Sequence, residues 1–156
     1  MSLNDVAGEM TQLVSFSVDR EEYAIPVLKI MEILRMPEVT RVPNTPTYVE
    51  GVMNLRGKVI PLVSLRKRFN LDGSENGRRT RTMVVDVTGE LMGFIVDSVS
   101  EVLRVAEAEI LPPPAAISAG VQQECVSGVI NRGERLLIML DLDKLIGSEE
   151  RGIMKE

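Results

Sequence analysis

Histidine is absent from the 156 residues of this chain, and cysteine occurs once, at Cys125. Histidine is the usual general base near neutral pH and the commonest metal ligand, so its absence removes phosphoryl transfer through histidine and most acid–base catalysis. One cysteine cannot form an internal disulfide, and without histidine it cannot complete a structural zinc site. We therefore expect a protein of a reducing compartment with no catalytic residue, no metal and no cofactor.

Aromatic residues are also scarce, at 3%, and the net charge is −5. Basic residues are scattered apart from two short clusters, at 66–68 and 78–81, so neither a broad phosphate-binding surface nor a base-stacking platform is expected. No apolar run approaches the roughly 18 residues that cross a bilayer, and no signal peptide is apparent. These absences predict a cytoplasmic location, no nucleic-acid partner and no direct membrane insertion.

Alternating apolar residues dominate what is present. Residues 12–18 alternate as a half-buried strand, 23–26 return as a second strand, and 51–63 fit two strands around an Arg-Gly turn. In 27–34 the apolar spacing fits a short helix or a bend. Ser64 is placed to cap a short basic helix that ends at Phe69. Pro61 lies inside a strand pattern and predicts a bulge or a sheet edge there.

The same order of features occurs twice. One constant shift places Ile30 on Val99 and Glu32 on Glu101, and a second, slightly longer shift places Asn54 on Asn131. Chance similarity between valine-rich hairpins is the alternative, but the order of features is preserved as well as the composition. The pattern predicts an all-β fold with a few short helices, built by internal duplication as two five-stranded β-barrels.

The duplication gives approximate boundaries. Barrel 1 is expected at about 12–72 and barrel 2 at about 80–147, joined by a loop rich in glycine and polar residues. Each half is too small to be very stable by itself, so we expect the barrels to share an apolar interface and to exchange strands. A lead at 1–11 and a charged tail at 148–156 favour a complete short protein.

Four motifs, taken in this order, resemble a known family. They are Glu22-Tyr23-Ala24-Ile25, Gly51-Val52-Met53-Asn54-Leu55-Arg56-Gly57, Ile60-Pro61-Leu62-Val63-Ser64-Leu65-Arg66 and Gly93-Phe94-Ile95-Val96-Asp97. The family is the CheW-like domain, and the resemblance extends from about residue 12 to residue 147. It implies two intertwined, SH3-like five-stranded barrels and a non-catalytic adaptor. Such an adaptor couples chemoreceptors to the histidine kinase CheA, by binding the receptors' cytoplasmic tips and the kinase's regulatory domain, and it localises to receptor arrays.

The resemblance also implies a receptor-binding groove between the barrels. The positions that match its apolar lining are Val14, Val27, Ile30, Ile33 and Val99. A stripe at 27, 30 and 33 is ordinarily core, but Leu28, Met31 and Leu34 need cover as well, so one set is expected to face a partner. Arg56 matches an arginine beside the receptor surface. From the residues alone, a solvated turn charge is the alternative.

The kinase contact is placed by resemblance near the loop after residue 111, at Pro112, Pro113, Pro114 and Ile117. Other functions stay open on the residues alone. The chain could be a CheW-like regulatory module of a larger kinase or a receiver fusion, or a double barrel that binds nucleic acid or a small ligand. The acidic net charge and the scarce aromatics weigh against nucleic acid. An enzyme is the weakest alternative.

Overall fold

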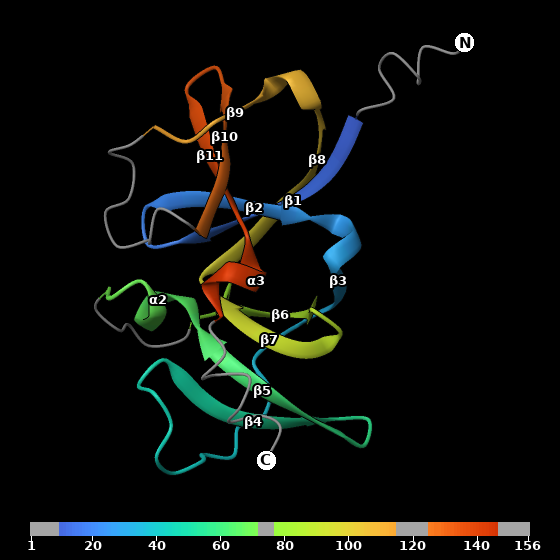
Figure 1. Cartoon of the computed structure of the whole chain (residues 1–156). Coiled ribbons are helices and arrows are strands. Elements are labelled where there is room, and N and C mark those ends of the chain that lie inside the picture. The colour runs from blue at the N-terminus through green and yellow to red at the C-terminus, as the bar shows by residue number, and fades with distance from the viewer. Residues whose placement is uncertain (1–9, 72–76, 115–124, 147–156) are drawn as a thin grey trace.

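The computed structural model describes residues 10–71, 77–114 and 125–146 (Figure 1). In the first half lie β1 (Met10–Val18), β2 (Glu21–Pro26), the 3₁₀ turn η1 (Val27–Lys29), β3 (Ile30–Leu34), β4 (Val49–Leu55), β5 (Lys58–Ser64) and α2 (Leu65–Arg68). In the second half lie β6 (Arg81–Val87), β7 (Glu90–Val96), β8 (Ser98–Ala106), η2 (Glu107–Glu109), β9 (Ile110–Leu111), β10 (Val126–Arg132), β11 (Arg135–Leu140) and α3 (Leu142–Leu145). The predicted all-β class with short helices is confirmed. Among the described residues, no helix has the length and apolar character needed to cross a membrane.

The described strands form two sheets, and each sheet takes strands from both halves of the sequence. One sheet has the order β8-β1-β2-β11-β10-β9, and the other has the order β3-β6-β7-β5-β4. Neighbours within a sheet run antiparallel except at two places, where β11 pairs with β2 and β5 pairs with β7 in parallel. The strands of 12–72 are thus divided between the sheets, as are those of 80–147.

The duplication predicted from the sequence appears in the strand order. Under the two shifts, β1, β2, β3, β4 and β5 correspond to β6, β7, β8, β10 and β11, and this exchange converts the order of the five-stranded sheet into that of the other sheet without β9. The second shift, which places Asn54 on Asn131, also places the first residues of β4, β5 and α2 on those of β10, β11 and α3. The helix caps repeat as well: the Ser64 hydroxyl accepts from the Lys67 amide, and the Asp141 carboxylate accepts from the Lys144 amide.

The largest apolar cluster joins the two sheets. Phe16 and Tyr23 come from one sheet and Phe94 from the other, and Phe69 follows α2; all four are buried. The Phe16 and Tyr23 rings stack with centroids 5.9 Å apart, and the Tyr23 ring centroid lies 5.3 Å from that of Phe69. Burying one such side chain contributes roughly 1.5–3 kcal/mol. Two smaller clusters lie on the opposite faces, one in each sheet.

Two local predictions need correction. The segment 27–34 is a single 3₁₀ turn followed by strand β3, because Ile30 to Leu34 pair with β6. Pro61 lies neither at an edge nor in a bulge of its own strand, since β5 pairs with β4 and with β7. The parallel pairing with β7 begins one residue after the proline, at Leu62 opposite Gly93. The N–H that proline lacks is therefore not needed by the β5–β7 ladder.

Close packing across the β5–β7 pairing yields a testable prediction. A Cβ on Gly93 would lie 2.5 Å from the Leu62 Cδ2 atom and 3.0 Å from the Thr82 Cγ2 atom. Gly93→Ala should therefore lower the free energy of unfolding by roughly 1–3 kcal/mol, measured by urea denaturation. Leu62→Val shortens the nearest side chain, so the double variant should lose less stability than the sum of the two single losses. Simple additivity would show that this contact is not the cause.

Candidate functional site

An exposed apolar surface lies on the segment that crosses from one sheet to the other. Leu28 is 94% exposed, Met31 60% and Ile33 41%. We call these three residues the β3 patch. Leu28 lies in η1, and the other two lie in β3, which is an edge strand. Apolar side chains that gather at the surface in this way mark sites of protein contact.

The residues predicted for the receptor groove are unequally available. Ile33 belongs to the β3 patch. Ile30 and Val99 are half-buried and pack against the main cluster, and Val27 is also half-buried. Val14 is 4% exposed within the sheet, so it presents almost no surface to a partner. The two predicted apolar sets of 27–34 do not separate in the structure: Leu28, Met31 and Ile33 are exposed, whereas Val27, Ile30 and Leu34 are half-buried.

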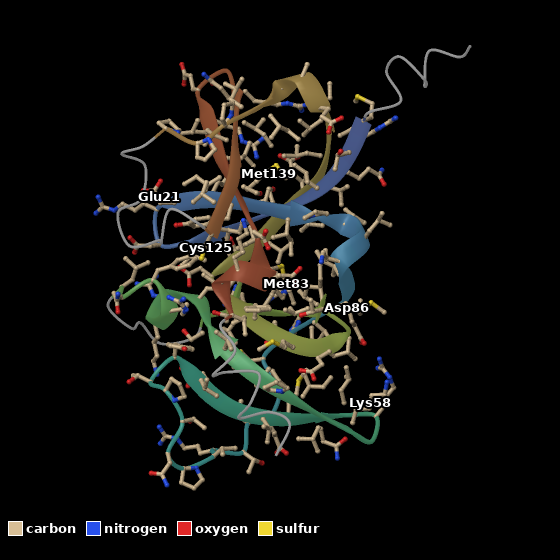
Figure 2. All side chains as sticks on the ribbon, viewed as in Figure 1. Glu21, Lys58, Met83, Asp86, Cys125 and Met139 are labelled. Atoms are coloured by element: carbon tan, nitrogen blue, oxygen red, sulfur yellow. The ribbon has the colours of Figure 1, made fainter. Side chains whose placement is uncertain are left out.

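Arg56 occupies a strained position at the tip of the β4–β5 hairpin, close to Lys58 where β5 begins (Figure 2). Its φ is 51°, that of Gly57 is 90°, and the Asn54 Oδ1 atom accepts a hydrogen bond of 2.8 Å from the Gly57 amide. Asn54 thus stabilises the turn. In the β10–β11 hairpin the first turn position holds Gly133, with φ 66°. A non-glycine residue in this region costs roughly 1–2 kcal/mol, and Thr88 in the β6–β7 turn holds the same conformation, with φ 47°.

The Arg56 guanidinium pairs with Glu32 of β3. Its Nη1 atom donates to Glu32 Oε2 at 3.3 Å, and its Nη2 atom donates to Oε1. Hydrogen bonding to Arg56 holds the pKa of the Glu32 carboxyl below its ordinary value, and the same bond raises the pKa of Arg56. The Arg56 side chain is still 71% exposed. Glu32 lies between Met31 and Ile33 in β3, and because successive side chains of a strand alternate, the accessible ion pair lies on the other face of the strand from these two residues.

The second half carries a related arrangement that the sequence reasoning missed. Arg135 of β11 binds Glu101 of β8 at 2.7 Å and Glu22 of β2 at 2.8 Å, and these hydrogen bonds raise the pKa of Arg135. Val102, next to Glu101, is 58% exposed. The shift that places Glu32 on Glu101 also places Ile33 on Val102. This correspondence in the sequence could have predicted the surface around Glu101 and Val102.

The basic run of α2 contacts other parts of the chain. Arg66 binds Asp97 at 2.7 Å, and Lys67 binds Glu50 at 2.8 Å. Arg68 donates to a main-chain oxygen of α3 at 2.9 Å. These contacts join α2 to the end of β7, to β4 and to α3. The run therefore serves the structure of the chain instead of facing only water.

The predicted kinase contact follows β9 at the edge of its sheet. Pro112 and Pro114 are exposed, and Pro113 is half-buried. Leu111, the last residue of β9, is 49% exposed. Ile117 lies outside the described residues. The described part of this surface is therefore apolar and accessible.

Comparison with known proteins identifies the family. A model described as the CheW-like domain matches residues 12–150. The chemotaxis protein CheW of Helicobacter pylori is 38% identical over 138 residues, which are 88% of this chain and 82% of that protein. CheW of Klebsiella aerogenes is 35% identical over 155 residues, which are 98% of this chain and 93% of that protein. The crystal structure of the scaffolding protein TtCheW from Thermoanaerobacter tengcongensis matches with a TM-score of 0.83 at 31% identity, over 90% of this chain and 94% of that one.

An all-β protein of two strand-exchanged sheets, with an apolar patch and an ion pair at its surface, is built for protein contact. The chain belongs to the CheW-like domain family. The resemblance drawn from the four motifs is thereby confirmed.

The Glu32–Arg56 pair can be tested by titration. Arg56→Gln should raise the pKa of Glu32 toward its ordinary value, as followed by carboxyl ¹³C chemical shifts, because the charged donor is lost. A pKa lowered by folding adds stability above the ordinary value, and that stability is lost as the pH falls through the folded-state pKa. The unfolding free energies of the two proteins should therefore converge in acid. Lys58→Gln removes a neighbouring charge of the hairpin and should leave the Glu32 pKa unchanged.

Proposed function

We propose that this chain is a chemotaxis adaptor of the cytoplasm that couples the cytoplasmic tips of chemoreceptors to the regulatory domain of the histidine kinase CheA. The observation that carries the proposal is the family match over nearly the whole chain, joined to an exposed apolar patch beside an ion pair. The adaptor acts by binding both partners, which brings it to receptor arrays, and the proposal contains no catalytic step.

The receptor contact is best placed on the β3 patch with Arg56. The patch supplies apolar area, and Arg56 supplies an accessible charge that favours one orientation of the bound segment. A receptor tip that forms a helical hairpin would lay an apolar helix face on such a surface, a common mode of peptide recognition. Ile30 and Val99 support the patch from below, because they are half-buried and pack against the main cluster, and Val27 is also half-buried.

We place the kinase contact after β9, which is an edge strand of the sheet that does not contain β3. Leu111 and Pro112 present apolar surface there, and β9 is a two-residue edge strand. The contact is expected to bury no more than the standard interface area of about 1,200–2,000 Å², since the two proteins exchange during signalling. Because this surface and the β3 patch belong to different sheets, both partners can be bound together.

A charge on the β3 patch should separate binding from folding. Met31→Glu and Ile33→Glu should each weaken binding of a receptor-tip fragment at least tenfold, because an unpaired charge would meet an apolar helix face. The free energy of unfolding should change by no more than about 0.5 kcal/mol, since both side chains are exposed. The measurements are calorimetric titration and thermal unfolding.

The matched control is Leu136→Glu, a change at a 51% exposed residue of the other sheet, which should leave receptor binding intact. Ile30→Glu should lower both affinity and stability, because Ile30 packs against the main cluster. Full receptor binding by Met31→Glu and Ile33→Glu would refute the placement of the site.

The kinase contact makes the reverse prediction. Leu111→Glu should weaken binding to the CheA regulatory domain at least tenfold and leave receptor binding unchanged. Met31→Glu should weaken receptor binding and leave kinase binding unchanged. Calorimetry with each purified partner decides this. An absence of heat with the unaltered chain at high micromolar concentration of the kinase domain would contradict the proposed function as a whole.

A further inference from the structure

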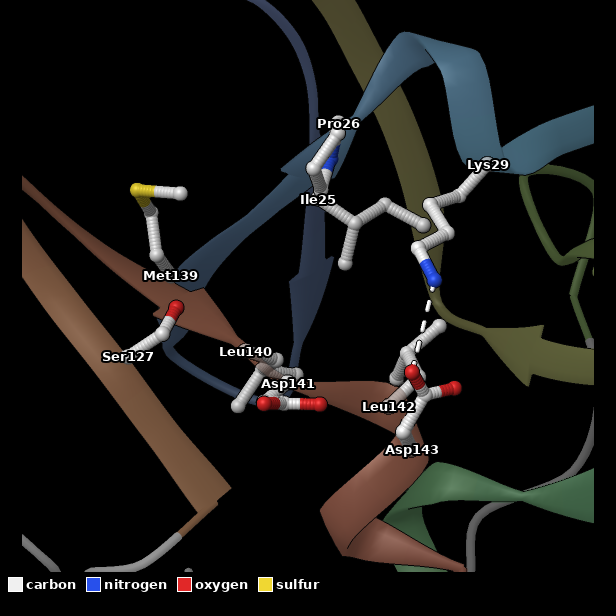
Figure 3. A pocket seen from close by; sticks show the side chains of 9 residues that line it. All are labelled: Ile25, Pro26, Lys29, Ser127, Met139, Leu140, Asp141, Leu142 and Asp143. Atoms are coloured by element: carbon white, nitrogen blue, oxygen red, sulfur yellow. Dashed lines mark hydrogen bonds and ion pairs between the residues drawn. The ribbon is translucent and has the colours of Figure 1, made fainter. Parts of the chain in front are cut away.

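A pocket lies beside η1, and none of its lining residues belongs to β3. Its cavity volume is about 220 Å³. It is bounded by the end of β2 and η1 on one side, and by β10, β11 and α3 on the other (Figure 3). The lining residues are Ile25, Pro26, Lys29, Ser127, Met139, Leu140, Asp141, Leu142 and Asp143. No contact proposed above for a receptor or a kinase uses these residues.

The pocket combines apolar walls with acidic groups. Ile25, Leu140 and Leu142 are buried side chains of the wall, while Asp141 and Asp143 lie together on the side of α3 (Figure 3). The Lys29 ammonium reaches Asp143 at 3.4 Å. Two carboxylates and one ammonium therefore line the pocket. An entering anion would meet an excess of negative charge, whereas an entering cation would be attracted.

The internal duplication shows that this opening is not a requirement of the fold. At the equivalent positions of the other half, Phe94 replaces Ile25 and Glu50 replaces Ser127. Glu50 pairs there with Lys67 at 2.8 Å, and Lys144 is the residue equivalent to Lys67. At these two positions the pocket has smaller side chains than its counterpart, whereas at Lys29 the counterpart has the smaller Ser98. The same backbone supports both arrangements, so the opening reflects a choice of side chains.

We propose that this pocket binds a compact apolar group that carries one positive charge. The volume suits a branched four- or five-carbon group with an ammonium head, since a cavity of about 150 Å³ already holds benzene. The apolar part would contact Ile25, Met139 and Leu142, and the charge would lie beside Asp141. This chemistry could come from a free amine or from a leucine followed by a lysine on a partner segment. Both sources supply a branched apolar group and an ammonium, which lie on one carbon chain in the amine and on two neighbouring side chains in the peptide.

The test uses isopentylamine, with isopentanol and isovalerate as neutral and anionic analogues of similar size. Methyl NMR of the full chain follows Ile25, Met139 and Leu142 during titration. The amine should shift these methyl signals and bind at least tenfold more tightly than either analogue. Equal binding of the three compounds would overturn the role of charge. Shifts confined to methyl groups elsewhere would overturn the site.

Two substitutions test the charge and the opening separately. Asp141→Asn removes one carboxylate but keeps the cap of α3, because asparagine caps helices as well as aspartate does; amine affinity should fall several-fold with no loss of folding. Ser127→Glu imports the residue of the other half and should pair with Lys144 across the mouth, which abolishes binding. Unchanged or tighter binding by Ser127→Glu would overturn the proposal, because added charge alone favours the amine.

The two sources are distinguished by peptides. Acetyl-Gly-Leu-Lys-Gly-amide is compared with acetyl-Gly-Leu-Gln-Gly-amide in the same titration. If the lysine peptide shifts the pocket methyl signals and the glutamine peptide does not, a partner segment is the source. If isopentylamine alone binds, the source is a free amine. Absence of binding by both isopentylamine and the lysine peptide refutes the pocket's assignment, and it leaves the adaptor function untouched.

Discussion

Parallel pairing between the halves of the chain is the constraint on which the rest of the structure depends. Leu62 opposite Gly93 and Met139 opposite Ala24 are equivalent contacts, and each joins a strand of one half to a strand of the other. Each sheet contains strands from both halves of the sequence, so neither half alone can form a complete sheet. The apolar cluster between the sheets also draws on both halves. The chain therefore folds as one unit, although its sequence divides into two similar parts.

Strand exchange also determines where the surfaces for partners lie. The chain must pass from one sheet to the other after β2 and again after β7. The first crossing is η1, a single short turn that leads into the edge strand β3 (Figure 1). It leaves Leu28 almost fully exposed. A crossing segment cannot be covered by both sheets at once. Apolar residues in it are consequently available for contact with another protein, without loss of the main cluster.

Local patterns predicted the local structure, and they failed where the pairing partner is distant in sequence. Alternation located the hairpins, and Ser64 was correctly predicted to cap its helix, because turns and caps involve residues close together in the chain. In 27–34, the apolar spacing resembled a helix, but pairing with β6, far along the chain, imposes a strand. Likewise, the partners of Arg66 and Lys67 lie in or beside other strands. Burial of Val14 follows from similarly distant pairing, because β8 flanks β1.

The duplication provides an internal comparison that a single sequence ordinarily lacks. Where both halves carry the same backbone, a difference between equivalent side chains cannot be ascribed to the fold. Arg56 has a left-handed conformation at a position that glycine, Gly133, occupies in the other half, and Ser127 lies where the other half has Glu50, which pairs with Lys67. An unfavourable residue kept in one copy, or a space left in one copy, needs a reason outside the fold. In the proposals made above, these unequal pairs are the positions at which one half contacts a partner or ligand that the other half does not bind.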